Sequence, residues 1–235
     1  TGKEVVASLF ESAVKGNCPF VKVNCAAIAP TLLESELFGH VKGAFTGAQS
    51  DKTGLIQSAH GGFIFLDEIS SLTLAAQASL LRVIDNQEIK RVGDQKTRSV
   101  DVRLVSATND DLEAMAREGT FRRDLWERLK ETVIELPPLR ERREEIPEIL
   151  AFFCRTMQGG PYELTPAAQS VLSSVEWRSG NVRELRNCLR SMTEYAADGK
   201  LTPMAIPDRI WQEFGDKEEG AGDDVTPEGE SSFNL

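Results

Sequence analysis

The stretch Phe63-Ile64-Phe65-Leu66-Asp67-Glu68 decides the fold class of this 235-residue chain. Its first four residues are apolar without interruption, which is typical of a strand buried on both faces of a parallel sheet. Two acids, Asp67 and Glu68, come where that strand would end. Because open α/β sheets bind their ligands at the carboxyl ends of the strands, these acids are placed where a binding site is expected.

Strand and helix patterns alternate on both sides of this stretch. Further strands are predicted at 20–24, 100–108 and 132–136. Helices are predicted at 5–14, 32–38 and 74–84. The glycine-rich segment 39–54 indicates a loop or hairpin. The alternation predicts an α/β fold, in which a parallel sheet is the middle layer of a three-layer sandwich.

The pattern changes after residue 142, where strand signals cease and only helical patterns remain. These helical patterns lie at 147–157, 166–175 and 181–196. The last residues are rich in acids, glycine and serine and contain few apolar side chains, a composition typical of disorder. We therefore expect an α/β subdomain at 1–142, a small all-helical subdomain at 143–214 and an acidic disordered tail at 215–235.

The amino-acid composition disfavours several classes of function. The net charge is −10, which disfavours a sequence-independent nucleic-acid binder, since such a protein needs a basic face. We expect no membrane span and no leader peptide, because no apolar run approaches about 18 residues and the start lacks a basic, apolar pattern. Two histidines, His40 and His60, are too few for a histidine-rich metal site. The cysteines match no zinc or redox spacing and are predicted to be buried thiols of a cytoplasmic protein: Cys18, Cys25, Cys154 and Cys188.

The chain begins Thr1-Gly2-Lys3-Glu4 and leads directly into the first predicted helix. A phosphate-binding loop ends in this way, because backbone N–H groups and the helix dipole both attract phosphate. Lys3 would then reach the β- and γ-phosphates of a nucleotide. Taken alone, however, an exposed lysine is the better interpretation of this pair of residues.

The acidic pair after the buried strand extends the hypothesis of a nucleotide-binding site. Asp67 is a candidate ligand of Mg²⁺, and Glu68 can polarise an attacking water molecule. The alternative is that the two acids cap the helix that follows. The stretch Ser106-Ala107-Thr108-Asn109 also ends a predicted strand and would place a polar side chain near the γ-phosphate, although a helix cap is the better interpretation of that stretch alone.

The loop Gly43-Ala44-Phe45-Thr46-Gly47-Ala48 resembles the signature loop of the NtrC-type enhancer-binding proteins, whose central domain is an AAA+ ATPase. A chance glycine-rich hairpin is the alternative. Other stretches also resemble this family, and they lie at 23–27, 33–40, 65–69, 81–83, 136–142 and 180–185. The resemblance covers residues 1 to about 195.

This resemblance implies a P-loop AAA+ fold with a helical lid, and it implies ATP and Mg²⁺ as cofactors. Members of the family hydrolyse ATP in a ring, here expected to contain six subunits. The ring remodels the closed complex of sigma-54 RNA polymerase into the open complex. The loop tip at Phe45 and Thr46 would contact sigma-54.

The resemblance also implies roles for individual residues. In the nucleotide site these are the phosphate-binding Thr1, Gly2, Lys3 and Glu4, the acidic pair Asp67 and Glu68, the glutamate-restraining Asn24, and the sensors Asn109 and Arg183. Stretch 121–129 is similar to the arginine-finger helix, in which Arg122 and Arg128 would reach the ATP of a neighbouring subunit. An exposed helical arginine is the alternative for both, and it is the preferred interpretation of Arg123.

Some family features are missing or altered. The glycine expected five residues before Gly2, and the strand before it, are not in this sequence, so it is expected to be a fragment. Arg178-Ser179 stands where the family usually has a lone proline, and Lys130 where asparagine is common. Contact with promoter DNA is expected only through a domain outside this sequence.

Two other functions stay open. Another ring-forming AAA+ remodelling ATPase would share Lys3, Asp67 and Glu68 but would lack the loop around Phe45 and Thr46. A truncated fragment that binds sigma-54 or neighbouring subunits without turnover is the second alternative.

Overall fold

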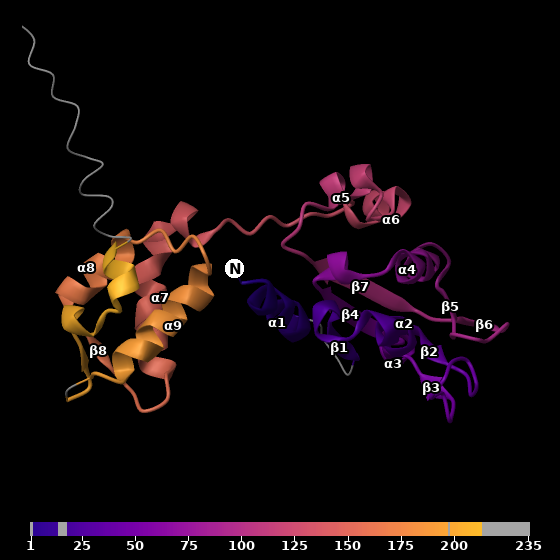
Figure 1. Ribbon diagram of the computed structural model, residues 1–235, viewed down its shortest axis with the longest axis horizontal. Coiled ribbons are helices and arrows are strands. Elements are labelled where there is room, and N and C mark those ends of the chain that lie inside the picture. Colours follow the sequence, from indigo (N-terminus) through magenta and orange to yellow (C-terminus); the bar gives the residue numbers. More distant parts are fainter. Residues whose placement is uncertain (1, 14–17, 197, 213–235) are drawn as a thin grey trace, which may run out of the picture. The chain divides into compact units, whose positions relative to one another are not determined.

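The computed structural model describes residues 2–13, 18–196 and 198–212 (Figure 1). The chain forms two compact units, of which the first is Lys3–Glu135 and the second contains the residues from Leu136 onward together with Gly2. Thr1 and the predicted acidic tail at 215–235 lie outside the described residues. The assignment of an ATPase subdomain to 1–142 and of a lid to 143–214 stays a prediction.

A parallel three-stranded sheet forms the centre of the first unit, as the sequence predicts. Its strands lie in the order β1-β4-β7 and are β1, Phe20–Asn24, β4, Gly62–Asp67, and β7, Val102–Ala107. The central strand β4 is almost entirely buried, which explains its uninterrupted apolar sequence. Asn24 pairs with Asp67 in the register, and Asp67 pairs with Ala107. The carboxyl ends of all three strands therefore meet at one edge of the sheet.

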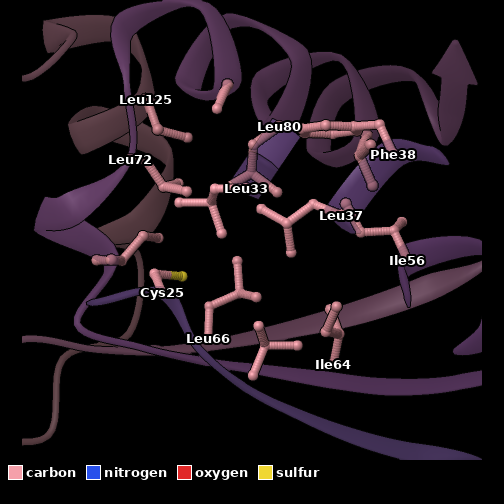
Figure 2. Packing of buried hydrophobic residues seen from close by; sticks show 14 of the residues in the cluster. Cys25, Leu33, Leu37, Phe38, Ile56, Ile64, Leu66, Leu72, Leu80 and Leu125 are labelled. Carbon is pink, nitrogen blue, oxygen red and sulfur yellow. The ribbon is translucent and has the colours of Figure 1, made fainter. Parts of the chain in front are cut away.

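Helices cover one face of this sheet and bury its apolar side chains. They include α2, Pro30–Phe38, α3, Leu55–Ser58, α4, Leu74–Asn86, and α6, Arg123–Leu129. Figure 2 shows Leu33 and Leu37 of α2 facing Leu66 of β4, with Leu80 of α4 beyond them. Full burial of such a side chain contributes about 1.5–3 kcal/mol. This core fixes the helices against the sheet, and with them the loops at its carboxyl edge.

Two hairpins extend from the first unit. Strand β2, Gly39–His40, pairs antiparallel with β3, Lys52–Thr53, so the predicted hairpin at 39–54 is confirmed. Strand β5, Glu88–Lys90, pairs antiparallel with β6, Thr97–Ser99, and this second hairpin was not predicted. Only Ile89 of its strand residues is buried, and one apolar side chain produces no alternating pattern.

The prediction of a strand at 132–136 is wrong. These residues form no strand, and the side chains of Val133 and Ile134 are 58% and 59% exposed. Strand β7 is the last in the sheet, and no strand of the described part of the chain pairs with 132–136. Because β-branched residues favour a strand chiefly through packing and pairing with neighbours, their sequence preference alone produces no ladder here.

The second unit contains the three predicted helices, which are α7, Ile146–Thr156, α8, Pro166–Ser174, and α9, Asn181–Thr193. They enclose a second apolar core around Trp177, whose Nε1 donates to the carbonyl of Leu172 at 3.0 Å. The prediction that strands cease after residue 142 is wrong in one detail. Strands β8, Glu163–Leu164, and β9, Lys200–Leu201, form a parallel pair too short to leave a sequence pattern.

The cysteines are free thiols, and Cys25, Cys154 and Cys188 are buried as predicted. Burial raises the pKa of the Cys25 thiol to about 11, with a smaller contribution from the charges of Asp67 and Glu68. Cys18 differs from the prediction, because it is only partly buried.

Candidate functional site

Polar side chains from four segments converge at the carboxyl edge of the sheet. Lys3, in the first turn of α1, Lys3–Ala13, places its Nζ 3.1 Å from Oε1 of Glu68 and 3.8 Å from Oδ1 of Asp67. Asn109, beyond the end of β7, donates from Nδ2 to the same Oε1 of Glu68 at 2.7 Å. Asn24, at the end of β1, donates to Oδ2 of Asp67 at 3.4 Å. The structure thus joins the predicted lysine, acids and asparagines in one cluster.

Glu68 occupies an uncommon backbone conformation. Its φ is 53° and its ψ is 53°, in the left-handed region that residues other than glycine rarely adopt. The sharp turn separates the two acids, since Asp67 still belongs to β4 whereas Glu68 precedes the short turn η2, Ile69–Ser71. Such conformations cluster at functional sites, where the surrounding structure maintains them.

The helix-cap alternatives receive no support from the geometry. The side chain of Glu68 makes no capping hydrogen bond to η2, and the following helix α4 is capped by Thr73, which accepts from the amide of Ala76. Helix α5, Leu112–Glu118, is capped by Asp111. That cap leaves the amide of Asn109 directed at Glu68.

The two asparagines take different partners. The side-chain amide of Asn109, rather than that of Asn24, donates to Glu68. Asn24 instead contacts Asp67 and accepts from the amide of Ala27 at 3.1 Å. The contact with Glu68 that the resemblance implies for Asn24 is therefore made in this structure by Asn109, and the restraining role stays a prediction.

The cluster fits Mg²⁺ bound together with a phosphate ligand. No group of three or more acidic, cysteine or histidine side chains capable of holding a metal ion occurs in the described ranges. Mg²⁺ is usually held by one or two carboxylates together with phosphates and water, so the buried carboxylate of Asp67 suits it. The ammonium of Lys3 supplies the charge that a phosphate needs.

The two predicted finger arginines lie on or beside α6. Arg122, immediately before the helix, contacts the carboxylate of Asp124 through Nε at 3.0 Å and through Nη2 at 2.6 Å. This pairing lowers the pKa of the Asp124 carboxyl and raises the pKa of Arg122. Arg128, in the last turn, places its Nε 2.8 Å from Oδ1 of Asp85 on α4. Arg123 is exposed, which agrees with its preferred interpretation as an exposed helical arginine.

Gln77 of α4 is a positioning residue that the sequence analysis missed. Its side chain is fully buried, and its Oε1 accepts from the backbone amide of Arg122 at 2.7 Å. Its Nε2 donates to the carbonyls of Leu72 and Thr120 at 2.8 and 3.4 Å. A glutamine on a helix gives no local signal of burial, so only the packing of α4 against the start of α6 identifies this role.

The loop Gly43–Ala48 lies at the tip of the first hairpin. Gly43 and Gly47 have φ values of 81° and 104°, the left-handed conformations that glycine permits at a tight reversal. The amide of Gly43 donates to the carbonyl of Ala48 at 2.9 Å and closes the loop. Phe45 is 38% exposed and packs edge-on against His40, with ring centroids 5.0 Å apart. Thr46 is exposed.

The remaining predicted site residues belong to the second unit or adjoin Lys3 in the sequence. Arg183 is exposed in the first turn of α9 in the second unit. Gly2 and Glu4 flank Lys3 at the start of α1, and Thr1 lies outside the described residues. The roles implied for these residues stay predictions.

Family models match both units. Residues 1–135 match the sigma-54 interaction domain, and residues 140–222 match an AAA+ ATPase lid domain. The chain belongs to the sigma-54 interaction domain family. This confirms the resemblance to the NtrC-type enhancer-binding proteins, sigma-54-dependent activators with an AAA+ domain.

Curated relatives of this chain include regulatory proteins. It is 50% identical over 194 residues to the Nif-specific regulatory protein of Herbaspirillum seropedicae, covering 80% of this chain and 36% of that protein. It is 46% identical over 217 residues to the regulatory protein AtoC of Escherichia coli, covering 90% of this chain and 47% of AtoC. The chain therefore spans between a third and a half of the length of these relatives.

Solved structures confirm the AAA+ fold of the domain. NtrX from Brucella abortus in complex with ATP matches it with a TM-score of 0.79 and 36% identity, covering 90% of this chain and 48% of NtrX. A RuvB variant of Thermotoga maritima, at 16% identity, has a TM-score of 0.53 over 91% of this chain and 58% of its own, and supports the fold alone. None of the helices in the described part is long and apolar enough to cross a membrane.

Proposed function

We propose that this sigma-54 interaction domain hydrolyses ATP with Mg²⁺ in a ring of subunits, expected to be six. The ring uses the loop Gly43–Ala48 to remodel the closed complex of sigma-54 RNA polymerase into the open complex. Contact with promoter DNA is made through another domain, and the protein acts in the cytoplasm.

The convergence of Lys3, Asp67, Glu68 and Asn109 at the carboxyl edge of the sheet carries this proposal. It places one cation, two carboxylates and an amide donor within a few ångströms of one another. Phosphoryl transfer needs such groups to neutralise charge and to position water. NtrX, which shares the fold, is known in complex with ATP and with ADP, which supports nucleotide binding.

Each residue then has a separate task. Lys3, with Thr1, Gly2 and Glu4 around it, binds the phosphates, and Asp67 holds Mg²⁺. When bound, the ion would supply positive charge beside the phosphate oxygens. Glu68 accepts a hydrogen bond from the attacking water and orients it, while Asn109 and Asn24 orient the two carboxylates.

Other tasks involve neighbouring subunits and partners. Arg122 and Arg128 reach the nucleotide of the adjacent subunit and stabilise the transferring charge. Arg183 of the lid senses the bound nucleotide. Phe45 and Thr46 contact sigma-54, because an exposed aromatic side chain on a projecting loop can serve as an anchor in an interface.

A substitution at Glu68 tests the catalytic assignment. In a chain extended upstream of Thr1 to include the whole phosphate-binding loop, Glu68→Gln should lower kcat for ATP by at least about 100-fold, because general-base assistance typically contributes 10²–10⁴-fold. ATP affinity should change little, since Lys3 is retained. Turnover near that of the parent would refute the role of Glu68.

The fragment alternative is tested in the same assay. The 235-residue chain is compared with the extended chain under identical conditions. Hydrolysis by the extended chain alone would support the alternative in which the shorter chain binds its partners without turnover. Hydrolysis by neither would contradict the proposed function.

A further inference from the structure

Arg128 is engaged by a carboxylate of its own subunit. Its Nε lies 2.8 Å from Oδ1 of Asp85, and its Nη1 lies 3.8 Å from Oε1 of Glu131. Glu131 is three residues further along the chain, whereas Asp85 belongs to α4. The close contact is therefore a bridge between two helices, and Glu131 makes only a distant local contact.

The position of Asp85 is electrostatically unfavourable for its own helix. It lies in the last turn of α4, residues 83–86, which contains no basic side chain. A carboxylate near a helix C-terminus is repelled by the negative end of the helix dipole. The guanidinium of Arg128 offsets this repulsion, so the pair has an electrostatic reason to form.

The two ends of α6 are held in different ways. At its start, the buried side chain of Gln77 binds the backbone amide of Arg122. Near its end, the side chains of Arg128 and Asp85 are 52% and 32% exposed. Packing thus fixes the backbone position of the helix, while the guanidinium of Arg128 is held mainly by a solvent-accessible ion pair that its flexible side chain can leave.

Arg122 offers a contrast. Its partner Asp124 is two residues further along the chain, in the first turn of α6, so the pair can stay together when Arg122 makes a new contact. Arg128 cannot do the same. Reaching a phosphate on a neighbouring subunit requires its guanidinium to leave Asp85, because one guanidinium cannot satisfy both anions in different places.

We propose that Asp85 is a parking site for the arginine finger Arg128 and restrains ATP turnover. The guanidinium binds either Asp85 of its own subunit or the phosphates held by the neighbouring subunit. Asp85 is in this sense a positioning residue that acts through Arg128. The inference rests on the proposed function, because it requires Arg128 to act on a neighbouring nucleotide.

The size of the restraint follows from the exposure of the pair. Ion pairs between exposed side chains are weak, so parking competes with catalysis only modestly. Removing the charge of Asp85 should therefore raise kcat about two- to five-fold, which corresponds to the range measured for exposed pairs.

The test uses the extended, ring-forming protein and measures kcat and KM for ATP. Asp85→Asn should raise kcat about two- to five-fold and leave KM within about two-fold, since the finger stabilises the transition state more than bound ATP. Asp85→Glu keeps the charge and should return kcat toward the parent. Glu131→Gln is the matched control, because it removes the distant carboxylate near Arg128, and it should leave kcat unchanged.

A double substitution separates parking from a general effect on the fold. In an Arg128→Ala background, Asp85→Asn should have no further effect on kcat, because the two residues act as one unit. A gain that persists in this background would overturn the proposal. So would an unchanged kcat in Asp85→Asn alone, or an equal gain in Glu131→Gln.

The turnover of Arg128→Ala distinguishes failure of the proposed function from failure of the parking role. If Arg128→Ala alone leaves turnover at the parental level, the finger assignment is wrong and the parking role falls with it. If Arg128→Ala abolishes turnover while Asp85→Asn changes nothing, only the parking role is wrong.

Discussion

At the residue scale, the site depends on how Glu68 is oriented. Its backbone is in the left-handed region, and its Oε1 lies 3.1 Å from Nζ of Lys3 and 2.7 Å from Nδ2 of Asn109. Both partners carry donors, and both would also attract a phosphate.

Gln77 provides a prediction about stability at this scale. Gln77→Leu should lower the free energy of unfolding by about 1–3 kcal/mol or more, because it leaves the buried amide of Arg122 and the carbonyl of Leu72 without their side-chain partner. Chemical denaturation of the chain measures this loss. The matched control is Gln95→Leu at an exposed position, where a change within about 0.5 kcal/mol is expected. Equal effects of the two substitutions would contradict the role of Gln77.

At the element scale, the two hairpins of the first unit are tied together. The amide of Val41 donates to the carbonyl of Val92 at 3.1 Å, and the amide of Val92 donates to the carbonyl of Gly39 at 2.9 Å. Arg91 adds side-chain contacts to Thr53 and Gln57 at 3.3 and 3.1 Å. The segment after β5 therefore supports the base of the loop proposed to contact sigma-54.

Phe45 on this loop provides the prediction at the element scale. Phe45→Ala should abolish binding to sigma-54 in the presence of a transition-state analogue of ATP hydrolysis, while ATP turnover and assembly stay largely intact. Because Phe45 is partly exposed and its ring contact with His40 is worth about 0.5–1.5 kcal/mol, stability should fall by less than the 3–5 kcal/mol of a core Phe→Ala change.

The matched control for this loop is Phe152→Ala, which removes an exposed phenyl ring from the second unit and should leave sigma-54 binding unchanged. Normal binding of sigma-54 by Phe45→Ala would refute the loop assignment. The function would then reduce to that of a generic ring-forming AAA+ ATPase.

At the scale of the whole molecule, the proposed chemistry is divided between subunits. In the proposed mechanism, Lys3 and Glu68 would act on the nucleotide of their own subunit, whereas Arg128 would act on that of a neighbour. A single subunit would therefore contain two half-sites. This arrangement makes turnover depend on assembly, which is the basis of the next prediction.

Mixing inactive variants tests this division. Lys3→Ala subunits mixed with Arg128→Ala subunits should recover part of the ATP turnover, because some interfaces combine an intact Lys3 with an intact Arg128. A mixture of Lys3→Ala with Glu68→Gln should recover none, since every site then contains a defect. Absence of recovery in the first mixture at every ratio, with assembly verified by size-exclusion chromatography, would count against a finger that acts in trans.

The sequence by itself determined the parts of this protein that depend on short-range signals. The buried strand that ends in Asp67, the alternation that builds the parallel sheet, the glycine-flanked loop and the family all follow from local patterns. The failed strand at 132–136 shows the limit of such patterns, because a strand needs a partner as well as the right residues.

Only the tertiary structure decided which polar groups meet. The hydrogen bond from Asn109 to Glu68 joins residues 41 apart, and that from Arg122 to Gln77 joins residues 45 apart. The ion pair between Arg128 and Asp85 likewise joins two separate helices. Such partners leave no periodic trace in the sequence, because the packing of one element against another, rather than local backbone preference, brings them within hydrogen-bonding distance.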